Sequence, residues 1–167
     1  MVFPHLFLLS FVNIASAVLI FISWWIVLFT GIYPRTFFDF QVSMLRWSLR
    51  LQARIFNLAD GYPAFGMSAQ DEKIMLDITY PEKLSRGLLL VRVFFGFFYI
   101  LIPHGLFLLF RAIATYFVVF IAWWAVLITG EYPKSLHNFV VGTLRWSMRL
   151  NLYLSFLTDK YPPFSGK

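Results

Sequence analysis

Two pairs of arginines have the residue type and spacing of an anion-binding site. Arg46 and Arg50 are four residues apart, and Arg145 and Arg149 repeat that spacing later in the chain. Residues four apart share one face of a helix, so each pair presents two planar, charged donors suited to lipid phosphates or to acidic residues of a partner. The simpler alternative is that these arginines only anchor a helix at a membrane surface by their charge.

Arg92 and Arg111 each stand alone within a long apolar run. A charged side chain at membrane depth either extends toward the surface or faces a protein group of opposite charge. No Asp or Glu occurs within these runs. We therefore expect the two arginines to bind lipid or a carboxylate that another membrane subunit supplies.

His5 and His104 both follow a proline near the start of an apolar run. An imidazole at that position could ligate a haem, a chlorin or a metal. We favour the interpretation that each histidine caps the start of a helix and meets water or a headgroup, because no carboxylate lies nearby to orient a ligating imidazole. We accordingly predict no metal site and no cofactor.

The chain has no spacing typical of a catalytic site. It contains no Gly-x-Ser-x-Gly, no His-Glu-x-x-His and no glycine-rich phosphate loop. We predict that the protein is not an enzyme and has no catalytic residues. The alternative is an enzyme built on Asp60 and Asp159, with the arginines holding a phosphate. Since no acidic residue lies within an apolar run, an ion-coupled carrier is also disfavoured.

The composition indicates a membrane protein. The 167 residues are 60% hydrophobic, 21% aromatic and only 13% charged, whereas soluble domains carry about 25% charged residues. Basic residues number 14 against 8 acidic ones, and they flank apolar runs, so an anionic membrane surface is a better partner for them than nucleic acid. Without cysteine, the chain has no disulfide framework.

Three apolar runs are long enough to be membrane spans, at residues 3–30, 87–102 and 105–129. If Pro103-His104-Gly105 is the turn between the last two, every basic residue except Arg92 and Arg111 falls on one face. The positive-inside rule then predicts a multi-pass protein of the bacterial inner membrane, with its N-terminus outside and its C-terminus cytoplasmic. The alternative is that these segments only dip into one leaflet.

An internal repeat organises the chain. Shifting the sequence by the separation of Trp24 from Trp123 aligns Trp-Trp, Thr-Gly-x-Tyr-Pro, Leu-Arg-Trp-Ser-x-Arg-Leu and Asp-x-Tyr-Pro-x-Phe without a gap. We predict a truncated unit over residues 1–66, a cytoplasmic linker with a short strand over 67–83, and a complete unit over 84–167. Because both copies run the same way, they form a tandem parallel repeat.

Each unit is expected to contain one amphipathic helix at the interface, over residues 35–58 and 134–157, after a break at Gly31-x-x-Pro34 or Gly130-x-x-Pro133. The fold class predicted is therefore an all-α membrane protein with three transmembrane helices and two interfacial amphipathic helices. Six aromatic residues are expected to anchor at the interface: Trp24, Trp25, Trp123, Trp124, Tyr62 and Tyr161.

These motifs together resemble a bacterial integral membrane family catalogued as domain of unknown function 4389. Residues 80–165 resemble one complete unit, from Tyr-Pro-Glu-Lys-Leu-Ser-Arg to Asp-x-Tyr-Pro-Pro-Phe, and residues 4–65 resemble a copy that lacks the opening segment and first span. The resemblance implies fold and location but no activity.

The function predicted from these features is that of a non-catalytic accessory or scaffold subunit of a larger inner-membrane complex. Its partners would be phospholipids and other membrane subunits, or further copies of itself, and it would bind anionic lipid or an acidic partner at the cytoplasmic leaflet. The alternative is a small transporter or channel component, which would need polar residues along a span.

Overall fold

The computed structural model describes residues 2–166, and within that range the chain is helical and contains no strand. The helices are α1 (Phe3–Thr30), α2 (Arg35–Ile55), α3 (Arg86–Gly96), the π-helical turn η1 (Phe97–Leu101), α4 (Ile102–Thr129) and α5 (Lys134–Leu154). The predicted all-α class is confirmed. The strand expected within residues 67–83 is wrong, because residues 74–80 have no regular secondary structure and no strand lies beside them in the described chain.

The helices form two antiparallel hairpins, α1 with α2 and α4 with α5. Gly31 and Gly130 end the first helix of each hairpin in the left-handed conformation, with φ of 73° and 75°. Their backbone N–H groups close the last turn, and Pro34 or Pro133 caps the helix that follows. The predicted breaks between helices are confirmed. They lie at glycines because glycine adopts the left-handed conformation at little cost.

The second helix of each hairpin also ends at equivalent residues. Asn57 and Phe156 have φ of 58° and 59°. The amide of the next residue reaches back to a carbonyl five residues earlier, at 2.8 Å for Leu58 and 3.0 Å for Leu157. Such a bond is the mark of a Schellman-type helix end, and it stops α2 and α5 three residues before the predicted boundaries.

The turn expected at Pro103-His104-Gly105 is wrong. These residues belong to the first turn of α4, and α3, η1 and α4 form one continuous helix of 44 residues, from Arg86 to Thr129. A proline inside a helix leaves the carbonyl four residues earlier without its backbone donor. Here that carbonyl belongs to Tyr99, and it accepts a hydrogen bond from the Tyr161 hydroxyl at 3.0 Å. The helix continues through Pro103, and this carbonyl has a side-chain donor in place of the missing backbone one.

Two helices, rather than three, are long and apolar enough to cross a membrane. They are α1, with 28 residues, and the continuous helix from Arg86 to Thr129. At 1.5 Å per residue the second is about 66 Å long, roughly twice the hydrocarbon thickness of a bilayer.

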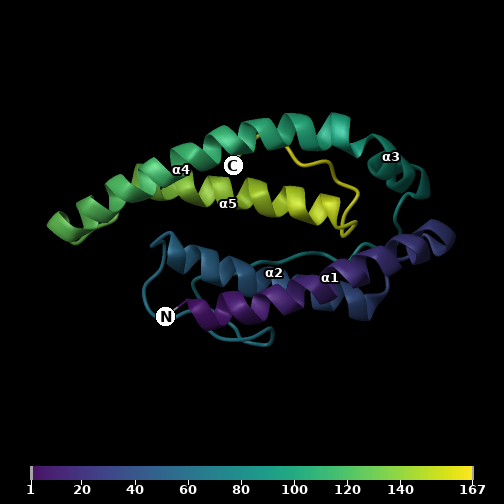
Figure 1. The fold of residues 1–167 in the computed structure, drawn as a ribbon, viewed down its shortest axis with the longest axis horizontal. Coiled ribbons are helices and arrows are strands. Elements are labelled where there is room, and N and C mark those ends of the chain that lie inside the picture. Colours follow the sequence, from purple (N-terminus) through teal and green to yellow (C-terminus); the bar gives the residue numbers. More distant parts are fainter. Residues whose placement is uncertain (1, 167) are drawn as a thin grey trace.

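Figure 1 shows a flat molecule in which α1, α2, α4 and α5 run along the long axis, with α5 between α4 and the first hairpin. The largest core cluster joins the two hairpins, because Met148 of α5 and Leu157 beyond it pack with buried residues of α1 and α2. A smaller cluster of Ile100, Leu150 and Tyr153 joins η1 to α5.

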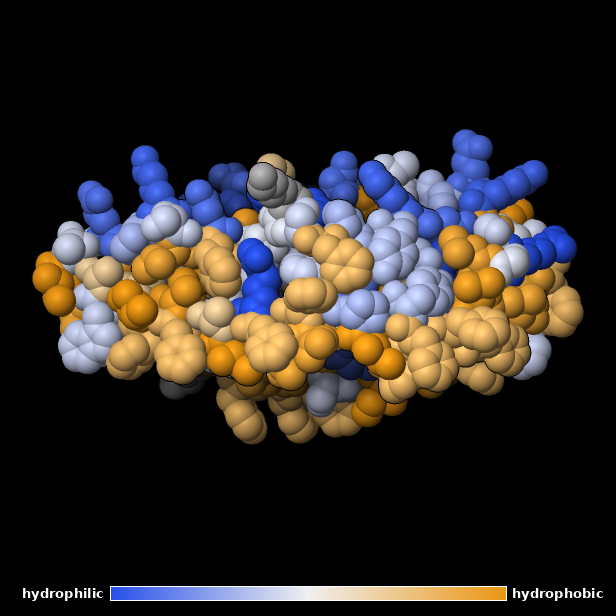
Figure 2. All heavy atoms as spheres, turned by 90° about the horizontal axis from the view of Figure 1, so that it is seen from above, coloured by the Kyte–Doolittle hydropathy of each residue, from blue (hydrophilic) through white to orange (hydrophobic). Residues whose placement is uncertain are grey.

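Polar and apolar residues are separated across the thickness of this flat molecule. Figure 2 views it edge-on, with hydrophilic residues along one edge and hydrophobic residues over most of the remaining surface in view. The helices lie along the length of the molecule, perpendicular to that direction. Polarity thus changes across the helices, not along them.

Candidate functional site

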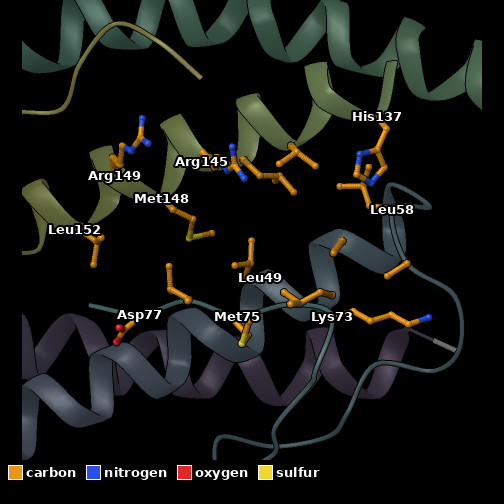
Figure 3. Close-up of a pocket in the computed structure, with 16 residues that line it drawn as sticks. Leu49, Leu58, Lys73, Met75, Asp77, His137, Arg145, Met148, Arg149 and Leu152 are labelled. Carbon is orange, nitrogen blue, oxygen red and sulfur yellow. The ribbon is translucent and has the colours of Figure 1, made fainter. Parts of the chain in front are cut away.

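A groove of about 520 Å³ lies between the hairpins, bounded by α2, α5 and the linker. Its aliphatic lining includes Leu49, Leu144, Met148 and Leu152. Figure 3 shows that Leu49, Met148 and Leu152 face the gap between the two helices, and that the linker runs along one side of the groove. The residues that line it are Leu49, Ala53, Leu58, Ala59, Lys73, Ile74, Met75, Leu76, Asp77, His137, Val141, Leu144, Arg145, Met148, Arg149 and Leu152.

The groove has a cationic rim. Arg145 and Arg149 come from α5 and Lys73 from the linker, while Asp77 is the one acidic residue that lines it. The ion pairs found within residues 2–166 are Arg35 with Asp39, Arg54 with Asp71 and Arg92 with Asp159, so none neutralises the rim. An apolar lining beside an excess of positive charge suits an amphiphile with an anionic head.

The arginines of α2 bind the segment of the same chain that follows this helix. Arg46 Nε donates to the Leu76 carbonyl at 2.8 Å, and Arg50 Nη2 donates to the Gly66 carbonyl at 2.6 Å. One turn further along, Arg54 pairs with Asp71 at 2.7 Å. The three residues share one face of the helix and fasten the segment from 66 to 76 along it.

Burial affects Arg50 most strongly among these arginines. Its side chain is 2% exposed, and this burial lowers the pKa of its guanidinium, while the charge of Asp71 raises it and that of Arg46 lowers it. Arginine begins from so high a pKa that the group stays charged. Arg50 is thus a buried cation held by a backbone carbonyl, which makes it a structural residue.

The equivalent arginines of α5 are less engaged. Arg149 Nη1 donates to the Ser165 carbonyl at 3.4 Å, at the position that corresponds to Gly66 in the first hairpin. Arg145 is exposed and makes no ion pair within residues 2–166. Of the six arginines predicted to bind lipid or a partner, Arg145 is therefore the one whose guanidinium has no hydrogen-bond or ion-pair partner within residues 2–166.

The expectation that Arg92 has no carboxylate partner in this chain is wrong. Its Nη2 pairs with the Asp159 carboxylate, and its Nη1 donates to the carbonyls of Tyr153 at 3.0 Å and Thr158 at 2.9 Å. The guanidinium carbon also lies 3.9 Å from the centre of the Tyr153 ring. Asp159 accepts in addition from the backbone N–H of Ser85, so this cluster joins the start of α3 to the end of α5.

Arg111 is also bound inside the chain, although not by a carboxylate. Its Nε donates to the Thr143 hydroxyl at 2.9 Å, and its Nη2 donates to the Phe139 carbonyl at 3.2 Å. Gly142 makes room for it, because a Cβ there would lie 2.8 Å from Arg111 Nη2. Neither arginine therefore requires a second subunit to satisfy it.

Each candidate histidine is buried against a tryptophan of the neighbouring helix. Trp47 Nε1 donates to His5 Nδ1, and Trp146 Nε1 donates to His104 Nδ1, both at 2.9 Å. Indole nitrogen can only donate, so Nδ1 of each histidine is unprotonated and Nε2 carries the hydrogen. Both rings are 0% exposed. They connect two helices, and in this structure their Nδ1 atoms are not free for a cofactor.

The final motif of each unit covers its histidine. The rings of Tyr62 and Phe65 lie 5.1 and 4.8 Å from that of His5. Tyr161 and Phe164, the equivalent residues, lie 5.3 and 3.9 Å from His104. The sequence contained the signal for this contact, since the histidine, the tryptophan and the Asp-x-Tyr-Pro-x-Phe motif all recur at one separation.

The two units differ in one hydrogen-bonded chain. His104 Nε2 lies 3.0 Å from the Tyr161 hydroxyl, which donates to the Tyr99 carbonyl. Partial burial and the neighbouring Tyr153 raise the pKa of Tyr161, which keeps its hydroxyl protonated as a donor. By contrast, His5 Nε2 is buried and has no partner within residues 2–166.

The predicted aromatic anchors occupy different environments. Trp25, Trp123 and Trp124 are exposed at 43%, 50% and 46%, near the ends of α1 and α4 that precede the glycine caps. Trp24 is half-buried against the main core. The two tyrosines lie over the histidines and remain partly exposed.

Comparison with known proteins gives one match. The protein-family model described as Domain of unknown function (DUF4389) matches residues 1–66 and 91–166, two segments that are consistent with a repeated unit. No curated protein and no solved structure matches the chain.

Proposed function

This chain belongs to the family of domain of unknown function DUF4389, whose description names no activity, so we propose a function from the groove itself. The protein is a non-catalytic membrane protein that binds the headgroup of an anionic phospholipid between α2 and α5. One observation carries this proposal: Arg145 is exposed, has no protein partner within residues 2–166, and stands at the rim of an aliphatic groove.

The chemistry of an anionic phospholipid suits both parts of the groove. A phosphate accepts charge-assisted hydrogen bonds from guanidinium and ammonium groups, here those of Arg145, Arg149 and Lys73. An acyl chain would cover the aliphatic side chains below, removing apolar surface from water. Binding would place the headgroup beside both hairpins, so the lipid would also hold them together.

The proposal includes the location of the groove, at the cytoplasmic leaflet of a bacterial inner membrane. The charge distribution supports this, because the formal net charge is +6 and basic residues collect at the cytoplasmic, anionic surface of membranes. The two helices that are long and apolar enough to cross a membrane support a membrane location in general.

A role as an accessory or scaffold subunit, or as a homo-oligomer, stays a prediction. Arg92 and Arg111 motivated it, and both have partners within the chain. The groove is compatible with an acidic residue of a partner in place of lipid, but its aliphatic lining favours an acyl chain. We therefore put lipid binding first.

A transporter or channel component receives less support from the contacts along α1. The Ser16 hydroxyl donates to Gln41 Oε1 at 2.6 Å. Ser10 and Asn13 bond to carbonyls of their own helix. These polar groups are used within the hairpin, whereas a transport path needs groups that face a permeating substrate.

The test compares Arg145→Gln with Lys134→Gln. Lys134 is exposed at the start of α5 and does not line the groove. The Lys134→Gln variant therefore removes one positive charge from the same helix without changing the groove. The probes are short-chain phosphatidylglycerol and, as the zwitterionic reference, short-chain phosphatidylcholine, titrated into detergent-solubilised protein by calorimetry. A charge-assisted hydrogen bond is worth about 1.5–3 kcal/mol, so we expect Arg145→Gln to weaken phosphatidylglycerol binding about tenfold or more.

Arg145→Lys distinguishes a fork from a point charge. If two parallel donors grip the phosphate, lysine keeps the charge but loses part of the affinity. Equal binding of both lipids by the unmodified protein, or equal effects of Arg145→Gln and Lys134→Gln, would contradict the proposed site.

A further inference from the structure

Helix α2 lies beside α1 along most of that helix. Near the start of α1, His5 accepts from Trp47, and midway Gln41 exchanges two hydrogen bonds with Ser16. The turn of residues 31–34 joins the other ends. Arg50 and Arg54 therefore lie toward one end of α1 and Arg35 at the opposite end.

The linker then returns along the same length. Asp71 pairs with Arg54, the Leu76 carbonyl accepts from Arg46, and Tyr80 donates to the Tyr33 carbonyl. Finally, the Leu84 amide donates to the Gly31 carbonyl at 2.8 Å, at the C-terminal end of α1. Residues 71–84 thus extend from one end of α1 to the other without forming a helix or a strand.

This arrangement makes a crossing of the bilayer by α1 very costly. At 28 residues, α1 is about 42 Å long and would span the hydrocarbon alone. Helix α2 and the linker would have to cross with it, which would place the arginines of α2 and the acidic residues of the linker in the hydrocarbon. The free-energy cost is about 2.5–3.5 kcal/mol or more for each charge. The non-helical linker would also bring unpaired backbone groups there.

The second hairpin has the same construction. His104 bonds to Trp146 near one end of α4, and Thr115 bonds to Thr143 further along. A crossing α4 would therefore carry α5, with Arg145 and Arg149, through the membrane beside it.

The exposed surface of α1 supports an alternative orientation. Phe7, Val18 and Phe29 are exposed at 55%, 53% and 71%, and α1 has no charged residue on any face. The charged residues of the hairpin are on α2 and the linker instead. Together with the edge of hydrophilic residues in Figure 2, this gives a molecule whose two broad sides prefer different solvents.

We infer that both hairpins lie within a single leaflet, with the helix axes parallel to the membrane plane. The apolar side contacts acyl chains, and the basic side lies among anionic headgroups. A helix with its side chains is about 10–12 Å across, which fits the roughly 15 Å of hydrocarbon in one leaflet. No charge and no unpaired linker backbone then enters the bilayer centre. This arrangement does not depend on the groove or on Arg145.

The first test uses single cysteines, which are unambiguous because the native chain has none. Glu72 and Glu82 are both exposed and lie near opposite ends of α1. We expect Glu72→Cys and Glu82→Cys to react with a membrane-impermeant maleimide from the same side, both in inverted membrane vesicles or both in intact spheroplasts. Reaction of one only in spheroplasts and of the other only in inverted vesicles would overturn the inference.

The second test measures depth along α1. Nitroxide labels at Phe7→Cys, Val18→Cys and Phe29→Cys are spaced by about three helical turns and therefore share one face. Depth is read from collision rates with oxygen and with a water-soluble nickel complex. We expect the same depth at all three sites. A label at Val18 that lies deep while those at Phe7 and Phe29 lie shallow would show that α1 crosses the bilayer.

Discussion

The buried histidine in each hairpin connects two helices through a single ring. Nδ1 accepts from a tryptophan of the neighbouring helix, so Nε2 carries the ring hydrogen. In the second hairpin His104 Nε2 contacts the Tyr161 hydroxyl, which donates to the Tyr99 carbonyl, whereas His5 Nε2 has no partner within residues 2–166. A buried polar group adds stability when every partner is present and costs it when one is missing, so the two hairpins should respond differently to the same change.

Tyr161→Phe should destabilise the protein, whereas Tyr62→Phe should not. Removal of the Tyr161 hydroxyl leaves both His104 Nε2 and the Tyr99 carbonyl without a partner, at a cost of about 1–3 kcal/mol. The Tyr62 hydroxyl makes no hydrogen bond within residues 2–166, and that residue is 58% exposed. We expect a change within about 0.5 kcal/mol there.

The measurement is denaturant unfolding in detergent micelles, followed by tryptophan fluorescence. Equal losses of stability in the two variants would contradict the hydrogen-bonded chain described for the second hairpin.

Among the elements, the helix ends and the continuous helix from Arg86 to Thr129 determine the shape. The two left-handed glycines reverse the chain after α1 and α4. The π-helical turn Phe97–Leu101 precedes Pro103, in the region where the proline removes a backbone donor. The Tyr161 hydroxyl supplies a donor to the Tyr99 carbonyl, and Arg92 of the same continuous helix pairs with Asp159.

Gly130→Ala should lower stability by about 1 kcal/mol, because an L-residue with a Cβ is strained at a φ of 75°. No atom lies within 4 Å of the new Cβ, so strain of the backbone is the cause. Gly105→Ala is the matched control, since Gly105 lies inside α4 with an ordinary helical φ and equally free space.

The Gly105→Ala substitution should raise stability by up to about 1 kcal/mol, because alanine favours a helix interior more than glycine does. The stability of both variants is measured by thermal unfolding followed by circular dichroism. A stabilising Gly130→Ala would show that the helix does not depend on this cap.

For the whole molecule, the decisive property is the separation of polar from apolar surface across its thickness. A body that inserts into one leaflet adds area to that leaflet alone, which favours curvature toward the inserted side. A bundle that crosses the bilayer adds area to both leaflets and has no such preference.

The protein should therefore reduce the diameter of vesicles into which it is reconstituted. We expect the mean diameter to fall as the protein-to-lipid ratio rises, measured by cryo-electron microscopy of vesicles containing phosphatidylglycerol. Vesicles prepared with the same detergent but no protein are the control. A diameter that does not depend on the ratio would count against insertion into one leaflet.

Local features of the sequence determined the class of fold and the two hairpins. The apolar runs predicted long helices, and the recurrence of Gly31 and Pro34 at Gly130 and Pro133 predicted where each helix stops. Such features are readable because a helix period and a glycine cap act between residues only a few positions apart. The arginine pairs could likewise be placed on one face of a helix.

Tertiary structure alone decided what those residues touch. Arg92 pairs with Asp159, which lies 67 positions away, and the Tyr161 hydroxyl donates to the Tyr99 carbonyl across 62 positions. The inference that α1 lies within one leaflet likewise rests on tertiary contacts, because the apolar content of α1 says nothing of the charged α2 and linker beside it. Burial of a charge depends on partners that only folding brings near, and no local pattern records them.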